Sequence, residues 1–437
     1  MKPIPKDIID GILAENDLQD LSKATIRQNV VVGATLEKLT GERFVHLEIG
    51  VPGIPACPIG VEAQKAALDS GVASVYPIIN GIPELKESAS RFVKAFLDID
   101  VSPRSIVPTV GSMQASYNLV LECSQLDPKK DTNLYICPGF SAHGRQPDVL
   151  GIKNVFFDIH DYRSDKLRDK LEEYLSQGNI SAILYATPNN PAWLCLTEEE
   201  LKIIGDCANK YDAVVIEDLA YFCMDFREDL SKPFQPPFQP TVARYTDNYV
   251  LTISASKIFS YAGERIACVV ISDKLFEREF ETLRSRYGIG GFGDNFILTF
   301  LYVCSSGTSH SAQHALAAMF QAAVEGRYDF VGEVRAYGRR AERSRKIFEK
   351  HGFHLVYDKD VDRPIGDGFF YTVEYKDLDN NTLLLQLMRC GIIAIALNTT
   401  RSIQPGIRVC VSRLLSDEDF VALDERLGLF EELEKEQ

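Results

Sequence analysis

The chain has 437 residues, of which 45% are hydrophobic and 25% are charged, a composition typical of a folded globular protein and unlike that of a disordered, collagen-like or coiled-coil chain. It carries 47 basic and 62 acidic residues, and the resulting net charge of −15 argues against general binding of nucleic acid. A single hydrophobic core stops growing at ~250–300 residues, so we expect two domains.

The sequence also bears on the cellular compartment. No apolar run reaches the ~18 residues that a membrane span needs, and the first residues lack the basic and apolar segments of a secretory signal. The ten cysteines form no CxxC pair, and most lie inside apolar runs, which predicts buried free thiols instead of disulfides or a zinc site. We therefore expect a cytoplasmic protein that binds no membrane.

The first part of the chain reads as helical. Polar and apolar residues alternate at helical spacing from Asp17 to Leu39. An extended segment rich in glycine and proline follows at 47–55 and marks a boundary. We assign residues 1–50 to an N-terminal helical segment that belongs to a small domain.

The middle of the chain alternates short apolar runs with longer helical stretches. Such alternation predicts an α/β fold with a mainly parallel sheet that is covered by helices on both faces. We assign 51–320 to this large domain. Its predicted strands contain Leu134–Cys137, Val155–Phe157, Ala182–Tyr185, Val214–Ile216, Val250–Ile253 and Cys268–Ile271.

After residue 320 the pattern changes. A charged helical stretch, 333–350, precedes strand-like segments at 369–373, 392–397 and 407–411. A last helix opens at Ser416 and places Phe420, Leu423 and Leu427 on one face. These features predict a smaller α+β domain, 321–437, which the N-terminal segment completes.

The segment that is most informative about chemistry begins where a predicted strand ends. Lys257 follows this strand between the hydroxyls of Ser254, Ser256 and Ser260, and Arg265 lies eight residues further on. Ligands of open α/β sheets bind at the carboxyl ends of the strands, and hydroxyls with an arginine suit a phosphate. A lysine beside a phosphate-bearing aldehyde is the arrangement for a Schiff base.

Two other strand ends carry polar side chains. Asp218 and Tyr221 follow the run Val214–Ile216, and Asn190 follows the run Ala182–Tyr185 in the sequence Thr-Pro-Asn-Asn-Pro. The sequence therefore places an acid, a phenol, an amide and a lysine along one edge of one sheet.

These residues resemble the motifs of the class I/II aminotransferases, which are pyridoxal-phosphate enzymes of fold type I. The resemblance runs from about Leu47 to the final helix and implies a large domain with a mainly parallel mixed sheet and a smaller α+β domain. Four more segments resemble family motifs in the family's order: Tyr76-Pro77, Gly111-Ser112-Met113-Gln114, Pro138-Gly139-Phe140 and Ile407–Val411.

The resemblance implies which residues act on the substrate and on the cofactor ring. Lys257 would form the Schiff base and move the proton. Asp218 would keep the ring nitrogen protonated, and Tyr221 and Asn190 would bond the ring oxygen. Arg408, with Asn190 beside it, would bind the substrate carboxylate.

The resemblance also implies which residues hold the cofactor in place. Phe140 would stack on the ring. Ser112 and Met113 would offer backbone N–H groups to the phosphate at a helix start, and Ser254 and Arg265 would add a hydroxyl and a guanidinium.

We therefore expect a homodimeric, pyridoxal-phosphate-dependent aminotransferase that moves an amino group from an L-amino acid to a 2-oxo acid. The resemblance implies shared active sites, in which Tyr76 reaches the neighbouring subunit's phosphate. The motifs do not separate this reaction from a C–S β-lyase or a decarboxylase on the same fold, and a non-catalytic binding module stays open. They do not identify the amino acid; Arg284 and Arg286 are candidates for an acidic side chain.

Some positions depart from the family pattern or remain open. Trp193 and Ala267 stand where the family has glycines, and we expect Trp193 to narrow the pocket. His143 either approaches the substrate or solvates a helix start. We expect no metal site, because His310 and His314 have helical spacing but no third ligand, and we read the glycine-rich run 288–293 as a loop.

Overall fold

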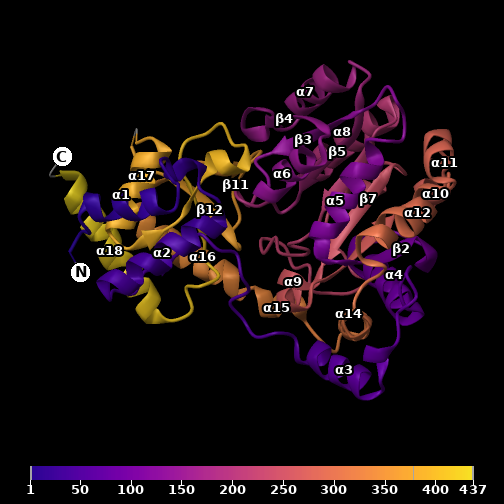
Figure 1. Ribbon diagram of the computed structural model, residues 1–437, viewed down its shortest axis with the longest axis horizontal. Helices are drawn as coiled ribbons and strands as arrows, with labels where there is room; N and C mark the ends of the chain where they lie inside the picture. The colour runs from indigo at the N-terminus through magenta and orange to yellow at the C-terminus, as the bar shows by residue number, and fades with distance from the viewer. Residues whose placement is uncertain (1, 377, 436–437) are drawn as a thin grey trace.

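The computed structural model describes residues 2–376 and 378–435 of the chain. Figure 1 shows a larger and a smaller part side by side, one built on a seven-stranded and the other on a four-stranded sheet, and the described chain begins and ends in the smaller part. Within the described residues, no helix combines the length and the apolar character needed to cross a membrane. Of the ten cysteines, nine are buried as free thiols, as predicted, and Cys304 is exposed.

The larger sheet has seven strands within the described residues, in the order β2-β8-β7-β6-β5-β3-β4. Strand β8 runs antiparallel to β2 and β7, and the other neighbours are parallel to each other. This confirms the predicted mainly parallel mixed sheet. The strands are β2 (Ile106–Val110), β3 (Thr132–Cys137), β4 (Lys153–Asp158), β5 (Ile180–Ala186), β6 (Val214–Asp218), β7 (Tyr249–Ser254) and β8 (Ile266–Ile271).

Helices cover both faces of this sheet. Along β3, Leu134 and Ile136 enter one hydrophobic core, whereas Tyr135 and Cys137 enter a second core, because successive side chains of a strand point to opposite faces. The helices are α3 (Pro58–Asp69), α4 (Pro83–Leu97), α5 (Gly111–Cys123), α6 (Ser141–Leu150), α7 (Lys166–Leu175), α8 (Glu198–Tyr211), α9 (Ala255–Ile258), α10 (Asp273–Glu277), α11 (Glu281–Tyr287), α12 (Phe292–Asn295), α13 (Tyr302–Ser305) and α14 (His310–Val324).

The smaller sheet is antiparallel and has the strand order β14-β15-β12-β9. Its strands are β9 (His354–Leu355), β12 (Phe370–Glu374), β14 (Ile395–Ala396) and β15 (Ile407–Cys410). Around it lie α1 (Lys6–Glu15), α2 (Ile26–Thr40), α16 (Ala336–Lys350), α17 (Asn380–Arg389) and α18 (Asp417–Lys435). The short helix α15 (Phe330–Val334) lies beside α9, and its Phe330 packs against Phe259.

The N-terminal segment joins this smaller part through β1 (Val45–His46), which pairs in parallel with β13 (Ile392–Ile393). The continuous helical pattern from Asp17 is wrong at its start, since α2 begins only at Ile26. Thr25 and Gln28 form a capping box there, which satisfies the first N–H groups of the helix. The domain limits at residues 50 and 320 stay predictions.

A hairpin of β10 (Lys359–Asp360) and β11 (Arg363–Pro364) ties the two parts together. Arg163 donates to the buried Asp360 carboxylate at 3.0 Å and Arg227 at 2.8 Å. The backbone N–H of Cys195 adds a hydrogen bond of 3.1 Å. A buried carboxylate is stable only when it is paired in this way, so the hairpin holds the segment after β5 in place.

Candidate active site

A cavity of about 760 Å³ opens at the carboxyl ends of β5, β6 and β7. Ten residues that the sequence singles out line it, namely Ser112, Met113, Phe140, Asn190, Asp218, Tyr221, Ser254, Lys257, Arg265 and Arg408. Nine of them come together because they lie at the same edge of the large sheet, where its parallel strands have their carboxyl ends, and Arg408 reaches the cavity from β15 of the smaller sheet. Their individual roles stay predictions.

Lys257 lies on α9, the short turn that follows β7. Ser254 caps this turn by accepting a hydrogen bond of 3.2 Å from the N–H of Ser256. The Lys257 amine donates to the carbonyl of Gly50 and lies 5.1 Å from the ring centre of Phe369. Burial lowers the pKa of this amine to about 8, because an apolar environment disfavours the charged form. The amine is therefore more nucleophilic near neutral pH than an exposed lysine.

Asp218 is the last residue of β6 and is buried. One of its carboxylate oxygens accepts hydrogen bonds from the Thr252 hydroxyl at 2.9 Å and from the Ala220 N–H at 3.1 Å. His143 Nε2 lies 3.5 Å from the other oxygen. Burial lowers the pKa of His143, which favours a neutral imidazole. The arrangement fixes a carboxylate at the cavity wall, where it can stabilise a protonated ring nitrogen.

Arg408 brings a positive charge into the cavity from β15. Its side chain is 1% exposed, and its guanidinium lies 4.6 Å from the ring centre of Phe370. It donates to Asn190 Oδ1 at 3.0 Å and to the carbonyl of Glu48. Among the described residues its Nε has no hydrogen-bond partner. A buried guanidinium without a carboxylate partner suits an anionic ligand.

Tyr221 forms the neighbouring part of the wall, and Trp193 packs behind it. The two rings meet edge to face at 5.2 Å, and the Trp193 side chain is fully buried. Trp193 has a positive φ of 62°, a conformation that glycine adopts freely. Thus the tryptophan keeps the backbone conformation of a glycine. It does not line the cavity, so the expectation that it narrows the pocket is wrong.

The space behind Trp193 is closely filled. A Cβ atom on Gly368 would lie 1.8 Å from the indole, so only a glycine fits there. Ala267 is buried on β8 opposite Ser254 and also lies outside the cavity wall. Both departures from the family pattern are therefore behind the wall.

The start of α5 fits a phosphate group. Gly111 opens this helix with a φ of 66°, and a Cβ atom there would come within 2.5 Å of the Arg265 guanidinium. Backbone N–H groups at a helix start attract anions, and Ser112 and Met113 line the cavity at this point. Together with Lys257 and a carboxylate, this donor set fits pyridoxal phosphate.

Three residues named in the sequence analysis lie outside the cavity of their own chain. Tyr76 is 89% exposed, and its expected role at the neighbouring subunit's phosphate stays a prediction. Arg284 and Arg286 lie on α11, away from the cavity, and Arg284 pairs with Glu279. The segment 22–27 also lines the cavity, and no motif predicts this because the segment precedes every motif that resembles the family.

The fold and this donor set are those of α/β proteins that attach pyridoxal phosphate to a lysine. The sequence pattern of the family described as "Aminotransferase class I and II" matches residues 43–424. The chain therefore belongs to this family, whose members generally depend on pyridoxal phosphate.

Individual relatives agree with this assignment. The chain is 26% identical over 277 residues to a probable aspartate aminotransferase of Methanocaldococcus jannaschii, which covers 63% of this chain and 66% of that relative. It is 28% identical over 238 residues to an aspartate aminotransferase of Pyrococcus horikoshii, which covers 54% and 58%. The matches thus span less than two thirds of these curated relatives.

Solved structures support the fold over nearly the whole chain. An aminotransferase from Mycobacterium tuberculosis superimposes with a TM-score of 0.75 at 17% identity, covering 94% of this chain and 96% of that one. The aspartate aminotransferase of Thermotoga maritima gives a TM-score of 0.74 at 19% identity, covering 97% and 99%. These likenesses confirm the predicted fold class.

Proposed function

We propose that the chain is a pyridoxal-phosphate-dependent aminotransferase that moves an amino group from an L-amino acid to a 2-oxo acid. The observation that carries the proposal is the pairing of Lys257, with its lowered pKa, and Asp218 at the ends of adjacent strands in one cavity. The cofactor, when bound, supplies an aldehyde that accepts the amino group and a ring that withdraws electrons from the substrate.

The chain's own residues orient the reactants and handle the proton. Arg408 binds the substrate carboxylate, and Asn190 keeps its guanidinium oriented. The Lys257 amine would take the proton from the substrate Cα and deliver it to the cofactor carbon that carried the aldehyde. Asp218 would hold a proton on the ring nitrogen, and Tyr221 would donate to the ring oxygen.

A second group of residues fixes the cofactor without touching the substrate. The N–H groups of Ser112 and Met113, the Ser254 hydroxyl and the Arg265 guanidinium would bind the phosphate. Phe140 would lie against the ring.

The assembly we propose is a homodimer in which Tyr76 serves the partner's site. Its sequence neighbours Val75 and Ile78 are exposed apolar side chains as well, and exposed apolar side chains next to each other suit a protein interface. Sedimentation should show a dimer at assay concentration; a fully active monomer would contradict shared sites. The buried free thiols suit a reducing compartment, and we place the protein in the cytoplasm.

A single-turnover reaction of the holoenzyme with an amino acid tests the proposed activity. Transfer should release one equivalent of 2-oxo acid per site and no ammonia. Ammonia with pyruvate would show a β-lyase, carbon dioxide a decarboxylase, and no product at all a binding module. Borohydride reduction and peptide mapping should label Lys257, and Lys257→Ala should abolish both label and turnover.

A further inference from the structure

The loop 187–196, which joins β5 to α8, carries Asn190 and is closed on itself by hydrogen bonds. The side-chain oxygen of the buried Asn189 accepts from the N–H groups of Ala192 at 3.0 Å and Leu194 at 3.2 Å. A buried network whose hydrogen bonds are satisfied makes the backbone rigid. The loop therefore responds as one unit when either of its ends is displaced.

The smaller part of the molecule holds this loop at two points. Arg408 of β15 donates to Asn190 Oδ1 at 3.0 Å, near the start of the loop. Asp360 of the hairpin β10–β11 accepts from the N–H of Cys195, at 3.1 and 3.2 Å, near its end. Figure 1 shows β11 on the side of the smaller part that faces the larger part. The same rigid loop thus connects the hairpin with the arginine of the proposed substrate site.

Asp360 belongs to a buried ion-pair cluster that holds both main-chain groups of Cys195. The Asp360 residue is 1% exposed. Arg163 and Arg227 of the larger part donate to one of its oxygens each, at 3.0 and 2.8 Å. Arg163 also donates to the Cys195 carbonyl at 3.2 Å. Charge-assisted hydrogen bonds of this kind have a defined geometry, so the cluster fixes the position of the Cys195 end of the loop.

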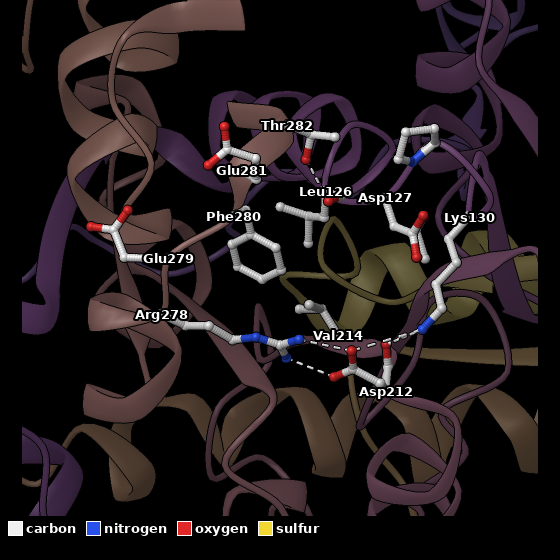
Figure 2. A pocket seen from close by; sticks show the side chains of 12 residues that line it. Leu126, Asp127, Lys130, Asp212, Val214, Arg278, Glu279, Phe280, Glu281 and Thr282 are labelled. Carbon is white, nitrogen blue, oxygen red and sulfur yellow. Dashed lines mark hydrogen bonds and ion pairs between the residues drawn. The ribbon is translucent and has the colours of Figure 1, made fainter. Parts of the chain in front are cut away.

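A second carboxylate with two basic neighbours lies on the larger part alone. Figure 2 shows Arg278 and Lys130 converging on Asp212. Arg278 donates to both carboxylate oxygens, at 2.6 and 2.7 Å, and the Lys130 ammonium lies 3.9 Å away. The Asp212 side chain is 52% exposed and lies outside the active-site cavity. Asp212 has the charge pattern of Asp360 without its contact between the two parts, which makes it a matched control.

We infer that Asp360 is a positioning residue of the proposed active site. Through Cys195 it sets the position of Asn190, which in turn orients the Arg408 guanidinium. This inference rests on the proposed function, in which Arg408 binds the substrate carboxylate. Asp360 does not itself line the cavity, so it acts through the loop. A displaced Asn190 removes a hydrogen bond that orients the guanidinium, and substrate binding then has to order this group at a cost in affinity.

The variant Asp360→Ala removes both acceptor oxygens and leaves the rest of the cluster paired. Arg163 keeps the Glu200 carboxylate, to which it donates at 2.7 and 2.9 Å. Arg227 keeps the Asp225 carboxylate at 2.8 Å. Neither arginine is left as an uncompensated buried charge, so we expect the variant to fold. Asp360→Asn is the conservative second variant, because its amide keeps one acceptor oxygen for the Cys195 N–H.

Two measurements on the holoenzyme separate substrate binding from chemistry. The first gives kcat and KM with an amino acid substrate. The second gives the Kd of an α-methyl amino acid, which has a carboxylate but no Cα proton, from the absorbance of the cofactor. Asp360→Ala should raise KM and Kd ~10-fold, whereas kcat should change by less than ~2-fold, because the lost interaction serves ground state and transition state alike. Asp360→Asn should lose less, and Asp212→Ala should keep all three wild-type values.

A double-variant cycle identifies the route of the effect. Asn190→Ala alone should weaken binding of the α-methyl amino acid, and the addition of Asp360→Ala should weaken it by less than ~2-fold further, because both act on one hydrogen bond to Arg408. Independent, multiplying losses would overturn the inference. An unchanged Kd in Asp360→Ala, an equal loss in Asp212→Ala, or a lower kcat at unchanged KM would overturn it as well. If Asp360→Ala does not take up the cofactor, Asp360→Asn decides, and a wild-type Kd there overturns the inference.

These outcomes distinguish the positioning role from the function on which it rests. Turnover by the wild type, with unchanged KM and Kd in both Asp360 variants, would refute the positioning role and leave the aminotransferase standing. Weakened binding in Asp360→Ala, with no turnover of any amino acid by the wild type, would support the positioning role and refute the aminotransferase.

Discussion

The ionisation of Lys257 determines how fast the protein attaches its cofactor, because only the neutral amine reacts with an aldehyde. Burial lowers the pKa of this amine from about 10.5 to about 8, and the positive charges of Arg408 and Arg265 act in the same direction. At pH 7 an amine of pKa ~8 is ~10% neutral, whereas one of pKa ~10.5 is ~0.03% neutral. The structure therefore predicts that the neutral fraction of the Lys257 amine at pH 7 is ~300-fold larger than that of an exposed lysine.

The assay mixes apoenzyme with pyridoxal phosphate from pH 6 to pH 10 and follows the absorbance change of attachment. The rate should rise about tenfold per pH unit up to ~8 and then level off. The reference is a lysine whose α-amine is blocked and whose ε-amine is free, in the same buffers, since the ratio of the two rates cancels the titration of the cofactor itself. Lys257→Ala gives the rate of reaction at all other amines of the protein. A midpoint near 10, like that of the reference, would refute the argument from burial.

Three substitutions test other parts of the site. Asp218→Ala should still bind the cofactor, but its single-turnover rate should fall ~10³-fold, which corresponds to ~4 kcal/mol of lost transition-state stabilisation; near wild-type turnover would exclude it as the partner of the ring nitrogen. Gly111→Ala should weaken cofactor binding ~10-fold or more in a titration, because its Cβ would lie 2.5 Å from a guanidinium group and a left-handed φ costs ~1–2 kcal/mol for other residues. Gly263 has open space around it, so Gly263→Ala should bind the cofactor normally. Equal effects of the two substitutions would contradict phosphate binding at the start of α5. Gly368→Ala should lower the free energy of unfolding, measured by chemical denaturation, by ~3 kcal/mol because the added Cβ collides with the Trp193 indole. In the double variant, Trp193→Leu should recover ~1 kcal/mol or more of that loss. Additive losses would show that the two residues do not meet.

Local sequence patterns predict the large sheet and the residues at its strand ends. The strand that ends in Asp218 was recognisable because a buried strand is an apolar run, and a charged residue at its end then falls at the ligand-binding edge. Lys257 was recognisable for the same reason. Thr197 and Glu200 have capping-box spacing in the sequence, and they form a capping box at the start of α8, Glu198.

Other features of the site depend on three-dimensional relations that have no local signal. Thr252 meets Asp218 because the two are paired in the register of β6 and β7, and register is not visible in either strand alone. His143 reaches the same carboxylate only through the position of α6. Arg27 lies at the cavity because the N-terminal segment is attached to the smaller part through the pairing of β1 with β13, across more than 300 residues of sequence.

The place of Trp193 has a practical consequence for solution experiments. It is the single tryptophan of the chain, so the indole fluorescence of the protein comes from one point, which lies against the ring of Tyr221. A cofactor held on the other side of Tyr221 would accept excitation energy from this indole and quench its emission. Cofactor exchange, ligand-induced rearrangement and local melting of the site should therefore be observable in real time, without an attached dye.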